Sequence, residues 1–330
     1  MSRARSWTLS LVAGVAAFAL WWRLFDGSRV TALVLRADPA LVLAGLALMG
    51  VAQLLRLGRW QALLNRFGRV PLLRTFRLLY ASEFLNNLLP VKVGDLGRAF
   101  ALAARSPGFT VGSATASIVV DRLWGIATRL LALTLLLVVP SRLPASLRVS
   151  AGIFAGVLVA AVVALLVWRR YGEALSRAGA PLLRLLPPAA RDVAARTLRA
   201  FADATVEVGM RPGLATVLFV LSAGSLLAQS AGFALLFHAA GHPLPLSVAI
   251  VGTALLDLLA VVPAPPAGVG TTEWYATLIF ATGLGQPTEA TAAAALLYHA
   301  AWLLIVFVAG AASLAAVGEM LPRRSPEPAA

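Results

Sequence analysis

The chain has 330 residues, of which 60% are hydrophobic and only 13% are charged. A soluble domain carries about 25% charged residues, so this composition indicates a polytopic membrane protein, and the length leaves no room for a second large soluble domain. The formal net charge of +14 does not indicate a nucleic-acid binder, because nearly all basic residues lie between apolar runs, where the positive-inside rule places them. The absence of cysteine excludes disulfides and thiolate metal sites.

Apolar runs predict six spanning helices, since a spanning helix needs about 20 apolar residues. In chain order the runs cover about 7–25, 39–58, 113–139, 149–168, 213–239 and 289–317. A basic connector follows the second run and holds Arg56, Arg59, Arg66, Arg69, Arg74 and Arg77. The longest connector, about 169–211, is interpreted either as an amphipathic helix on anionic lipid or as a solvated loop. We predict one transmembrane domain over 1–318 and a disordered cytoplasmic tail over 319–330.

Two further apolar stretches, at about 78–105 and 247–284, are interrupted by proline and glycine. In the first, Pro90 ends the incoming half-helix, Gly94 permits the turn and Asp95 caps the returning half-helix. The second repeats this order with Pro263, Gly268, Gly270 and Thr271 or Thr272. Matched broken segments in two halves point to a transporter's binding site, and half-helix N-termini at the midplane favour phosphate or carboxylate groups. Ordinary external loops are the alternative interpretation.

The topology follows from counting basic residues on each side of the membrane. Cytoplasmic termini and connectors place eighteen basic residues inside against four outside, which are Arg29, Arg36, Arg142 and Arg148. This arrangement is possible only if, at each broken segment, the chain enters and leaves the membrane on the same side. We therefore predict an all-α polytopic membrane protein of about six spanning helices plus two oppositely oriented re-entrant helical hairpins, an inverted repeat. A fully spanning broken helix in either place also fits the apolar pattern.

Charged residues at membrane depth form the second signal. A charge at the bilayer centre costs roughly 2.5–3.5 kcal/mol, so such residues are expected to face one another or a polar cavity. The candidates for substrate binding are Arg98, Arg122, Glu273, Asp257, Asp121, Glu83 and Lys92. Asp121 and Arg122 are adjacent and do not share a helix face, so each is expected to pair with a hairpin charge. The alternative interpretation is that these residues form ion pairs that only stabilise the fold. For Lys92 a further alternative is that its side chain snorkels to the membrane interface.

Other chemistries have little support in the sequence. The three histidines are scattered, and His299, in the last apolar run, is expected to be a packed and hydrogen-bonded residue. The Gly268–Thr272 segment lacks the lysine of a phosphate-binding loop, and no metal-ligand spacing is present. We therefore predict no cofactor, no metal and no catalytic residue.

Three motifs carry a family resemblance. The first is Asn86-Asn87-Leu88-Leu89-Pro90 followed by Gly94-Asp95-Leu96-Gly97-Arg98, the second is Asp121-Arg122 followed by Gly125, and the third is Pro263 followed by Gly268-Val269-Gly270 and Glu273. Together they resemble the lysylphosphatidylglycerol synthase transmembrane-region family, often called flippase-like, over about 10–318. The resemblance implies a multi-pass protein of the bacterial inner membrane that moves or handles lipids. It does not imply lysyl transfer, which in that family belongs to a separate soluble domain. Val93 and Pro265-Pro266 depart from the family pattern.

The sequence thus predicts a lipid translocase that binds a phosphate-bearing headgroup at the membrane midplane. Arg98, Arg122 and the half-helix ends are expected to hold the phosphate of an anionic or amino-modified phospholipid. Glu273, together with Asp257, is expected to meet an amine or hydroxyl, or to carry a coupling proton. A membrane-embedded transferase or accessory subunit acting on a polyprenyl-phosphate or lipid is one alternative, and a non-catalytic scaffold is another. No nucleic-acid partner is expected.

Overall fold

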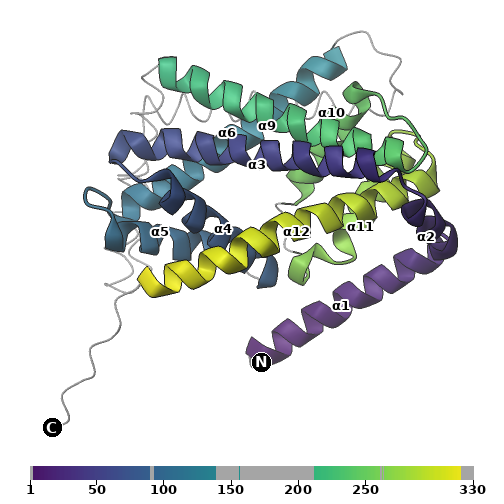
Figure 1. The fold of residues 1–330 in the computed structure, drawn as a ribbon, viewed down its shortest axis with the longest axis horizontal. Helices are drawn as coiled ribbons and strands as arrows, with labels where there is room; N and C mark the ends of the chain where they lie inside the picture. Colours follow the sequence, from purple (N-terminus) through teal and green to yellow (C-terminus); the bar gives the residue numbers. More distant parts are fainter. Residues whose placement is uncertain are drawn as a thin grey trace.

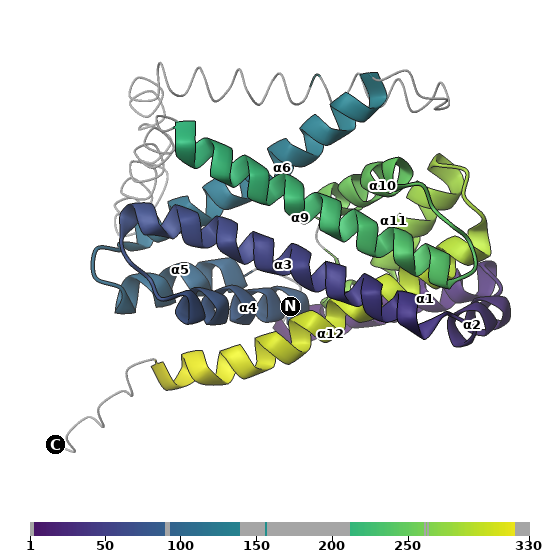
Figure 2. The same cartoon turned by 45° about the horizontal axis from the view of Figure 1, so that its top comes forward.

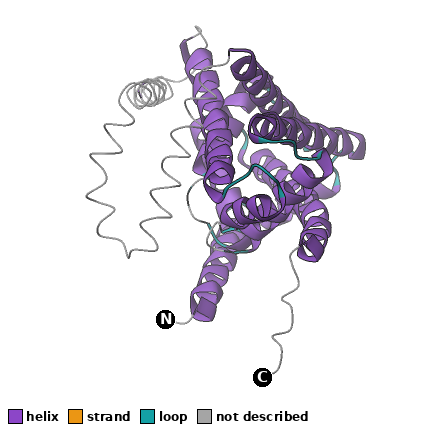
Figure 3. Ribbon diagram, turned by 90° about the vertical axis from the view of Figure 1, so that its left-hand side faces the viewer, coloured by secondary structure: helices purple, strands orange, loops and turns teal. Residues whose placement is uncertain are grey.

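The computed structural model describes residues 3–89, 93–138, 212–260 and 264–320, together with Gly156 and Val262. These residues form helices and no strand, as Figure 3 shows, so the predicted all-α class is confirmed for them. The helices are α1 (Arg3–Leu24), α2 (Gly27–Leu35), α3 (Pro39–Phe67), α4 (Leu72–Leu88), α5 (Gly94–Arg105), α6 (Val111–Val138), α9 (Pro212–Ala239), α10 (Leu246–Leu259), α11 (Thr271–Thr277) and α12 (Thr288–Met320) (Figure 1). A 3₁₀ turn, η1 (Pro266–Gly268), precedes α11, and a π-helical turn, η2 (Leu278–Gly283), follows it.

Several predicted features lie outside the described residues. They are the span at 149–168, the connector at 169–211, the tail beyond Met320, and the three positions Pro90, Lys92 and Pro263.

Three of the described helices are long and apolar enough to cross a membrane: α3, 213–239 of α9 and 288–316 of α12. The pair α1 and α2, bent by 88°, gives a fourth if it is counted as one span. A helix of 29 residues such as α3 is about 43 Å long, which exceeds the roughly 30 Å of a hydrocarbon core. In contrast, α4, α5 and α10 have 17, 12 and 14 residues. These helices are too short to cross by themselves.

The helix α3 is longer than predicted, and this corrects the boundary of the first basic connector. Arg56 and Arg59 lie inside α3 and not in a solvated connector. Arg59 is only 4% exposed, because Asp121 of α6 supplies a carboxylate that offsets the cost of burying its charge. Glu83 of α4 does the same for Arg56. Without these two residues, the predicted bias of basic residues is sixteen to four and keeps its sign.

The centre of the molecule is an antiparallel pair of long helices, α3 and α9, which lie side by side in Figures 1 and 2. The backbone N–H of Asp38, just before α3, donates to the carbonyl of Ala239 at the end of α9 over 3.3 Å. A Cβ on Gly45 would lie 3.0 Å from the carbonyl oxygen of Gly232, and one on Gly232 would lie 2.8 Å from that of Gly45. Reciprocal glycines therefore bring the two backbones into contact, as small residues do in membrane helix pairs.

The first broken pair, α4–α5, folds back on itself. A Cβ on Gly94, the first residue of α5, would lie 2.1 Å from the backbone oxygen of Ser82 in α4, so only glycine fits this approach. At the other end, Arg74 Nη1 donates to the carbonyl oxygen of Arg105 over 2.6 Å. The beginning of α4 and the end of α5 therefore lie together, at the end of the molecule where α3 also ends.

The second broken pair, α10–α11, lies at the opposite end (Figures 1 and 2). Gly252 of α10 packs on Phe280 of η2, and a Cβ there would lie 2.0 Å from the ring. The helix α1 lies along α11, where Trp21 Nε1 donates to Thr277 Oγ1 and Trp274 Nε1 donates to the carbonyl of Ala17, each over 2.9 Å. The second pair is therefore held by close packing against a neighbouring helix.

Candidate functional site

A cavity of about 300 Å³ lies between the breaks of the two pairs. The first break contributes Asn86, Asn87 and Leu89 to its lining. The second contributes Ala260, Val262, Ala264, Pro265, Ala267, Gly268, Thr271 and Thr272. Side chains from α3, α6, α9 and α12 close the remaining walls. Two segments separated by about 170 residues of sequence thus meet at one polar space.

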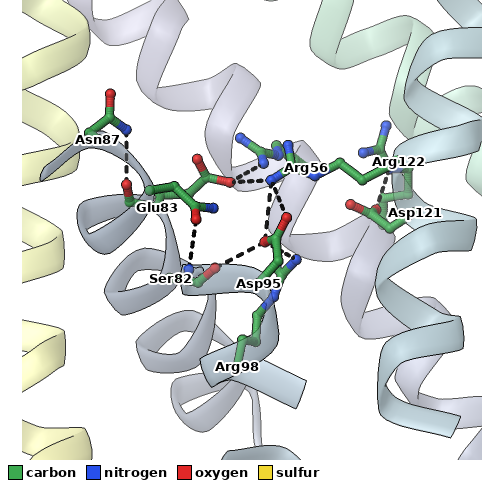
Figure 4. Close-up of polar contacts among 11 residues, drawn as sticks. Arg56, Ser82, Glu83, Asn87, Asp95, Arg98, Asp121 and Arg122 are labelled. Carbon is green, nitrogen blue, oxygen red and sulfur yellow. Dashed lines mark hydrogen bonds and ion pairs between the residues drawn. The ribbon is translucent and has the colours of Figure 1, made fainter. Parts of the chain in front are cut away.

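Charged side chains cluster beside the first break, and we call this set the charge cluster (Arg56, Arg59, Glu83, Asp95, Arg98, Asp121 and Arg122). Arg122 Nη2 lies 3.1 Å from Glu83 Oε1 and 3.1 Å from Asp95 Oδ2. Arg56 also donates to Glu83. Figure 4 shows Glu83, Asp95 and Arg122 pointing toward one another between α4, α5 and α6. The predicted pairing of Arg122 with charges of the first broken segment is confirmed.

The predicted role of Asp95 as a helix cap is wrong. Val93 occupies the N-cap position of α5, with no side-chain cap hydrogen bond. The Asp95 carboxylate instead accepts hydrogen bonds from Ser82 Oγ and Arg98 Nη2, each at 3.0 Å. The N–H of Gly94, one of the amides expected to face a phosphate, donates to Asn86 Oδ1 over 2.8 Å. The carboxylate forms ion pairs instead of a cap, because two arginines reach it, one from the next turn of α5 and one from α6.

Arg98 and Arg122 were predicted to act together, but they lie in different surroundings. Arg122 lines the cavity, and its side chain is 40% exposed. Arg98 is buried, and its guanidinium carbon lies 4.3 Å from the centroid of the Trp60 ring, a cation–π geometry. Arg98 is not part of the cavity lining, and its Nε and Nη1 have no hydrogen-bond partner among the described residues. Of the two, only Arg122 is placed to meet a ligand directly.

Asp121 was expected to pair with a hairpin charge, and this expectation is wrong. Its Oδ1 accepts from Arg59 Nε of α3 at 2.7 Å, and Arg59 Nη1 donates to Ser222 Oγ of α9 at 3.0 Å. The reason is that α3 continues past its apolar stretch as far as Phe67 and so keeps Arg59 within the helix, where it reaches Asp121. Within the charge cluster, four guanidinium groups face three carboxylates. One positive charge is left for an anion to balance.

A second polar network joins Asp257 of α10 to three other helices. Asp257 Oδ2 accepts from Arg129 Nε of α6 at 2.7 Å, and Oδ1 accepts from Gln229 Nε2 of α9 at 3.0 Å. Gln229 also donates to Tyr298 Oη of α12 at 2.8 Å. All four side chains line the cavity. Arg129 was missed in the sequence, although it follows Arg122 by seven residues and so shares its helix face.

Glu273 and His299 form a buried pair at the second break. Glu273 lies in the first turn of α11, and its Oε1 is 2.6 Å from His299 Nδ1. The other ring nitrogen, Nε2, is 2.8 Å from the carbonyl oxygen of Ala267. Both side chains are at most 5% exposed, and His299 lines the cavity. The expectation that His299 is packed and hydrogen-bonded is confirmed.

The turn before α11 differs from the prediction in its cap. Gly270, with φ +80°, is the N-cap of α11, and no side chain caps that end. Thr271 instead donates its hydroxyl to the carbonyl of Gly268 over 2.9 Å. Gly268 has φ +69°, and Ala267 has φ +57°, a left-handed conformation that is strained for a residue with a side chain. Two glycines and a strained alanine therefore make the second break.

The predicted residues fall into three groups. Glu83, Arg122, Asp257, Gly268 and Thr271 line the cavity. Gly94, Asp95, Arg98, Asp121, Gly270 and Glu273 lie behind this lining. Lys92, Pro90 and Pro263 lie outside the described residues. Among the residues that the structure describes, no group of three or more acidic or histidine side chains is placed to hold a metal ion.

The helices and the cavity define a helical membrane protein with a charged site enclosed between two broken helix pairs. The chain belongs to the family described as the lysylphosphatidylglycerol synthase TM region, whose sequence model matches residues 7–310. This match confirms the resemblance that the three motifs carry, and it links the chain to membrane proteins that handle lipids. A comparison with curated proteins finds no match to the chain.

Proposed function

We propose that this protein moves a phosphate-bearing lipid headgroup between the membrane leaflets and binds it in the cavity between the two breaks. The observation that carries the proposal is the unbalanced charge of the charge cluster, in which Arg122 faces the cavity. A buried positive charge without a full complement of carboxylates favours an anionic ligand. Phosphate fits best, because the planar guanidinium of arginine binds two of its oxygens at once.

The proposal includes the topology expected from the sequence. We take α4–α5 and α10–α11 to be re-entrant hairpins that enter from opposite faces of one domain over 1–318, in a bacterial inner membrane. Three facts support this. The beginning of α4 and the end of α5, which together form the open end of that hairpin, are held side by side by the contact between Arg74 and Arg105. The helices are too short to cross, and the two pairs lie at opposite ends of the molecule. The arginines near the open end of α4–α5 favour a cytoplasmic position for that end and for both termini.

In this proposal the headgroup phosphate competes with Glu83 for Arg122. Arg56 also contacts Glu83, so that carboxylate keeps a cationic partner when Arg122 turns to the ligand. Arg98 acts through Asp95, which it contacts directly, and its direct contact with a phosphate stays a prediction. Glu83 therefore stays paired when Arg122 turns away, because its contact with Arg56 remains.

The far wall of the cavity suits the remainder of a headgroup. Asp257, Thr271 and Tyr298 offer carboxylate and hydroxyl groups there, which match an amine or a hydroxyl of an amino-modified or glycerol-type phospholipid. A volume of about 300 Å³ is at the lower end of ligand pockets. The headgroup fits such a space, while the acyl chains remain in the surrounding lipid.

The test is the exchange of a fluorescent phospholipid between leaflets of vesicles that contain the purified protein. Arg122→Lys keeps the charge but loses the two-pronged contact, so we expect exchange to fall about tenfold or more, as the loss of a charged hydrogen bond of roughly 1.5–3 kcal/mol implies. Arg29→Lys is the matched control, because Arg29 is 71% exposed and pairs only with surface carboxylates in the described structure. Equal rates for Arg122→Lys and wild type would leave the charge cluster with a structural role only and favour a scaffold.

A further inference from the structure

The two ring nitrogens of His299 both face hydrogen-bond acceptors. A backbone carbonyl only accepts, so the 2.8 Å contact with Ala267 requires a hydrogen on Nε2. The 2.6 Å contact between Nδ1 and Glu273 Oε1 then needs a hydrogen of its own. A neutral ring beside an ionised carboxylate supplies none, because the Nδ1 lone pair would face the carboxylate oxygen. The pair therefore holds one proton more than that state, either on Nδ1 or on the Glu273 carboxyl.

We infer that Glu273 and His299 form a buried proton-binding site, and that its proton is exchanged through the cavity during translocation. With the proton the pair is neutral overall, and without it the pair carries one negative charge at membrane depth. Glu273 is 3% exposed, and its Oε2 has no hydrogen-bond partner among the described residues. His299, which lines the cavity, provides the route by which the proton reaches the cavity.

Besides Glu273, the carboxylates around the cavity each contact a guanidinium group. Arg56 and Arg122 contact Glu83, Arg59 contacts Asp121, and Arg129 contacts Asp257. Tyr275 from α11 and Tyr298 from α12 add phenol groups, and tryptophan rings make the side-chain hydrogen bonds between α1 and α11. Those carboxylates are each paired with a guanidinium group and do not compete for the proton. The proton is therefore held by Glu273 and His299.

The second break depends on this proton. The Nε2 hydrogen of His299 holds the carbonyl of Ala267, a residue at φ +57° between Pro266 and Gly268. After the proton leaves, one ring hydrogen remains for two acceptors, and the ionised carboxylate is the stronger of them. The bond to Ala267 is then lost, and the strained turn loses its link to α12. Proton release thus frees the turn, and proton uptake fixes it.

This inference rests on the proposed function only for the coupling to lipid movement, and the proton itself is tested without transport. The chain has three histidines, so a His238→Gln/His242→Gln variant labelled with ring-¹⁵N histidine reports His299 alone by NMR. At neutral pH we expect two protonated ring nitrogens, or one bare nitrogen together with an infrared band of a protonated carboxyl that Glu273→Gln removes. One bare nitrogen with no such band overturns the inference.

The coupling is tested in vesicles with an imposed pH gradient. We expect the gradient to change the lipid exchange rate of the wild type severalfold and to leave Glu273→Gln and His299→Gln insensitive, while His242→Gln behaves as the wild type. Size-exclusion profiles check the folding of each variant. Exchange that ignores the gradient in the wild type overturns the coupling but leaves the proposed function. Absent exchange in a protein with the NMR or infrared signature overturns the proposed function and leaves the proton site.

Discussion

The two broken helix pairs meet at one cavity but are held by different forces. The α4–α5 pair is fixed by a set of ion pairs that links it to α3 and α6. The α10–α11 pair is fixed by close packing on α1 and Phe280, by one ion pair from Asp257 to Arg129 of α6, and by the carboxylate–imidazole contact of Glu273 with His299. Ion pairs at membrane depth are costly to separate, whereas one hydrogen-bonded proton is easily exchanged. Under the proposed function, the first pair is therefore suited to recognition of the ligand and the second to movement.

The largest effect is expected from breaking the charge cluster. Asp121→Ala leaves Arg59 buried without its carboxylate, so the free energy of unfolding should fall by about 3–5 kcal/mol. Denaturant unfolding in mild detergent measures this. The double variant Arg59→Met/Asp121→Leu should regain most of the loss, since it removes both charges. The exposed pair of Arg29 and Asp26 is the control, and Arg29→Ala should cost less than about 1 kcal/mol. A small loss for Asp121→Ala alone contradicts the account of the first pair.

An intermediate effect is expected from adding one methyl group to either pair. In Gly94→Ala the new Cβ would meet the backbone oxygen of Ser82 at 2.1 Å, while in Gly252→Ala it would meet the ring of Phe280 at 2.0 Å. A side-chain ring can turn aside, but a helix backbone cannot. Overpacking costs typically 1–3 kcal/mol, and we expect Gly94→Ala near the upper end and Gly252→Ala near the lower end.

The same unfolding measurement checks both glycine variants. Phe280→Leu in the Gly252→Ala background should restore stability, because the smaller side chain makes room for the methyl group. Equal losses for the two single variants, or no rescue by Phe280→Leu, would show that the two pairs are packed with similar rigidity.

The smallest perturbation tests whether the two pairs open on opposite faces. The chain has no cysteine, so single cysteines can be placed at Ser28, near the open end of α10–α11, and at Asn65, near that of α4–α5. Both positions are exposed, and neither change should alter stability by more than about 0.5 kcal/mol. In intact cells an impermeant thiol reagent should label Ser28→Cys and leave Asn65→Cys unlabelled. Labelling of both, or of neither, would place the two open ends on one face.

Sequence patterns located both breaks, because proline and glycine interrupt apolar stretches in a way that depends only on neighbouring residues. They also identified Arg122, Asp257 and Glu273, since a charge inside an apolar run needs a buried partner. They failed at Arg56 and Arg59, because an arginine after an apolar run has the same signature whether the helix stops or continues to a distant carboxylate. Gln229 and Tyr298 gave no signal, since their roles arise only where α9 and α12 meet Asp257. The role of Asp95 was predicted wrongly, because a helix cap and an ion-pair partner require the same residue type at the same position.

The glycine crossing of α3 and α9 limits which movements of the helices are compatible with the proposed function. Gly45 and Gly232 put the two backbones in direct contact, and the bond between Asp38 and Ala239 ties the helices again at one end. Such a pair acts as a rigid strut across the membrane, because neither helix can slide or tilt without a clash at the crossing. Two halves that rock about a central site would have to separate this strut. Under the proposed function, access to the cavity from the two sides of the membrane is therefore expected to come from short segments that open against a stationary frame, and not from a rocking of the two halves.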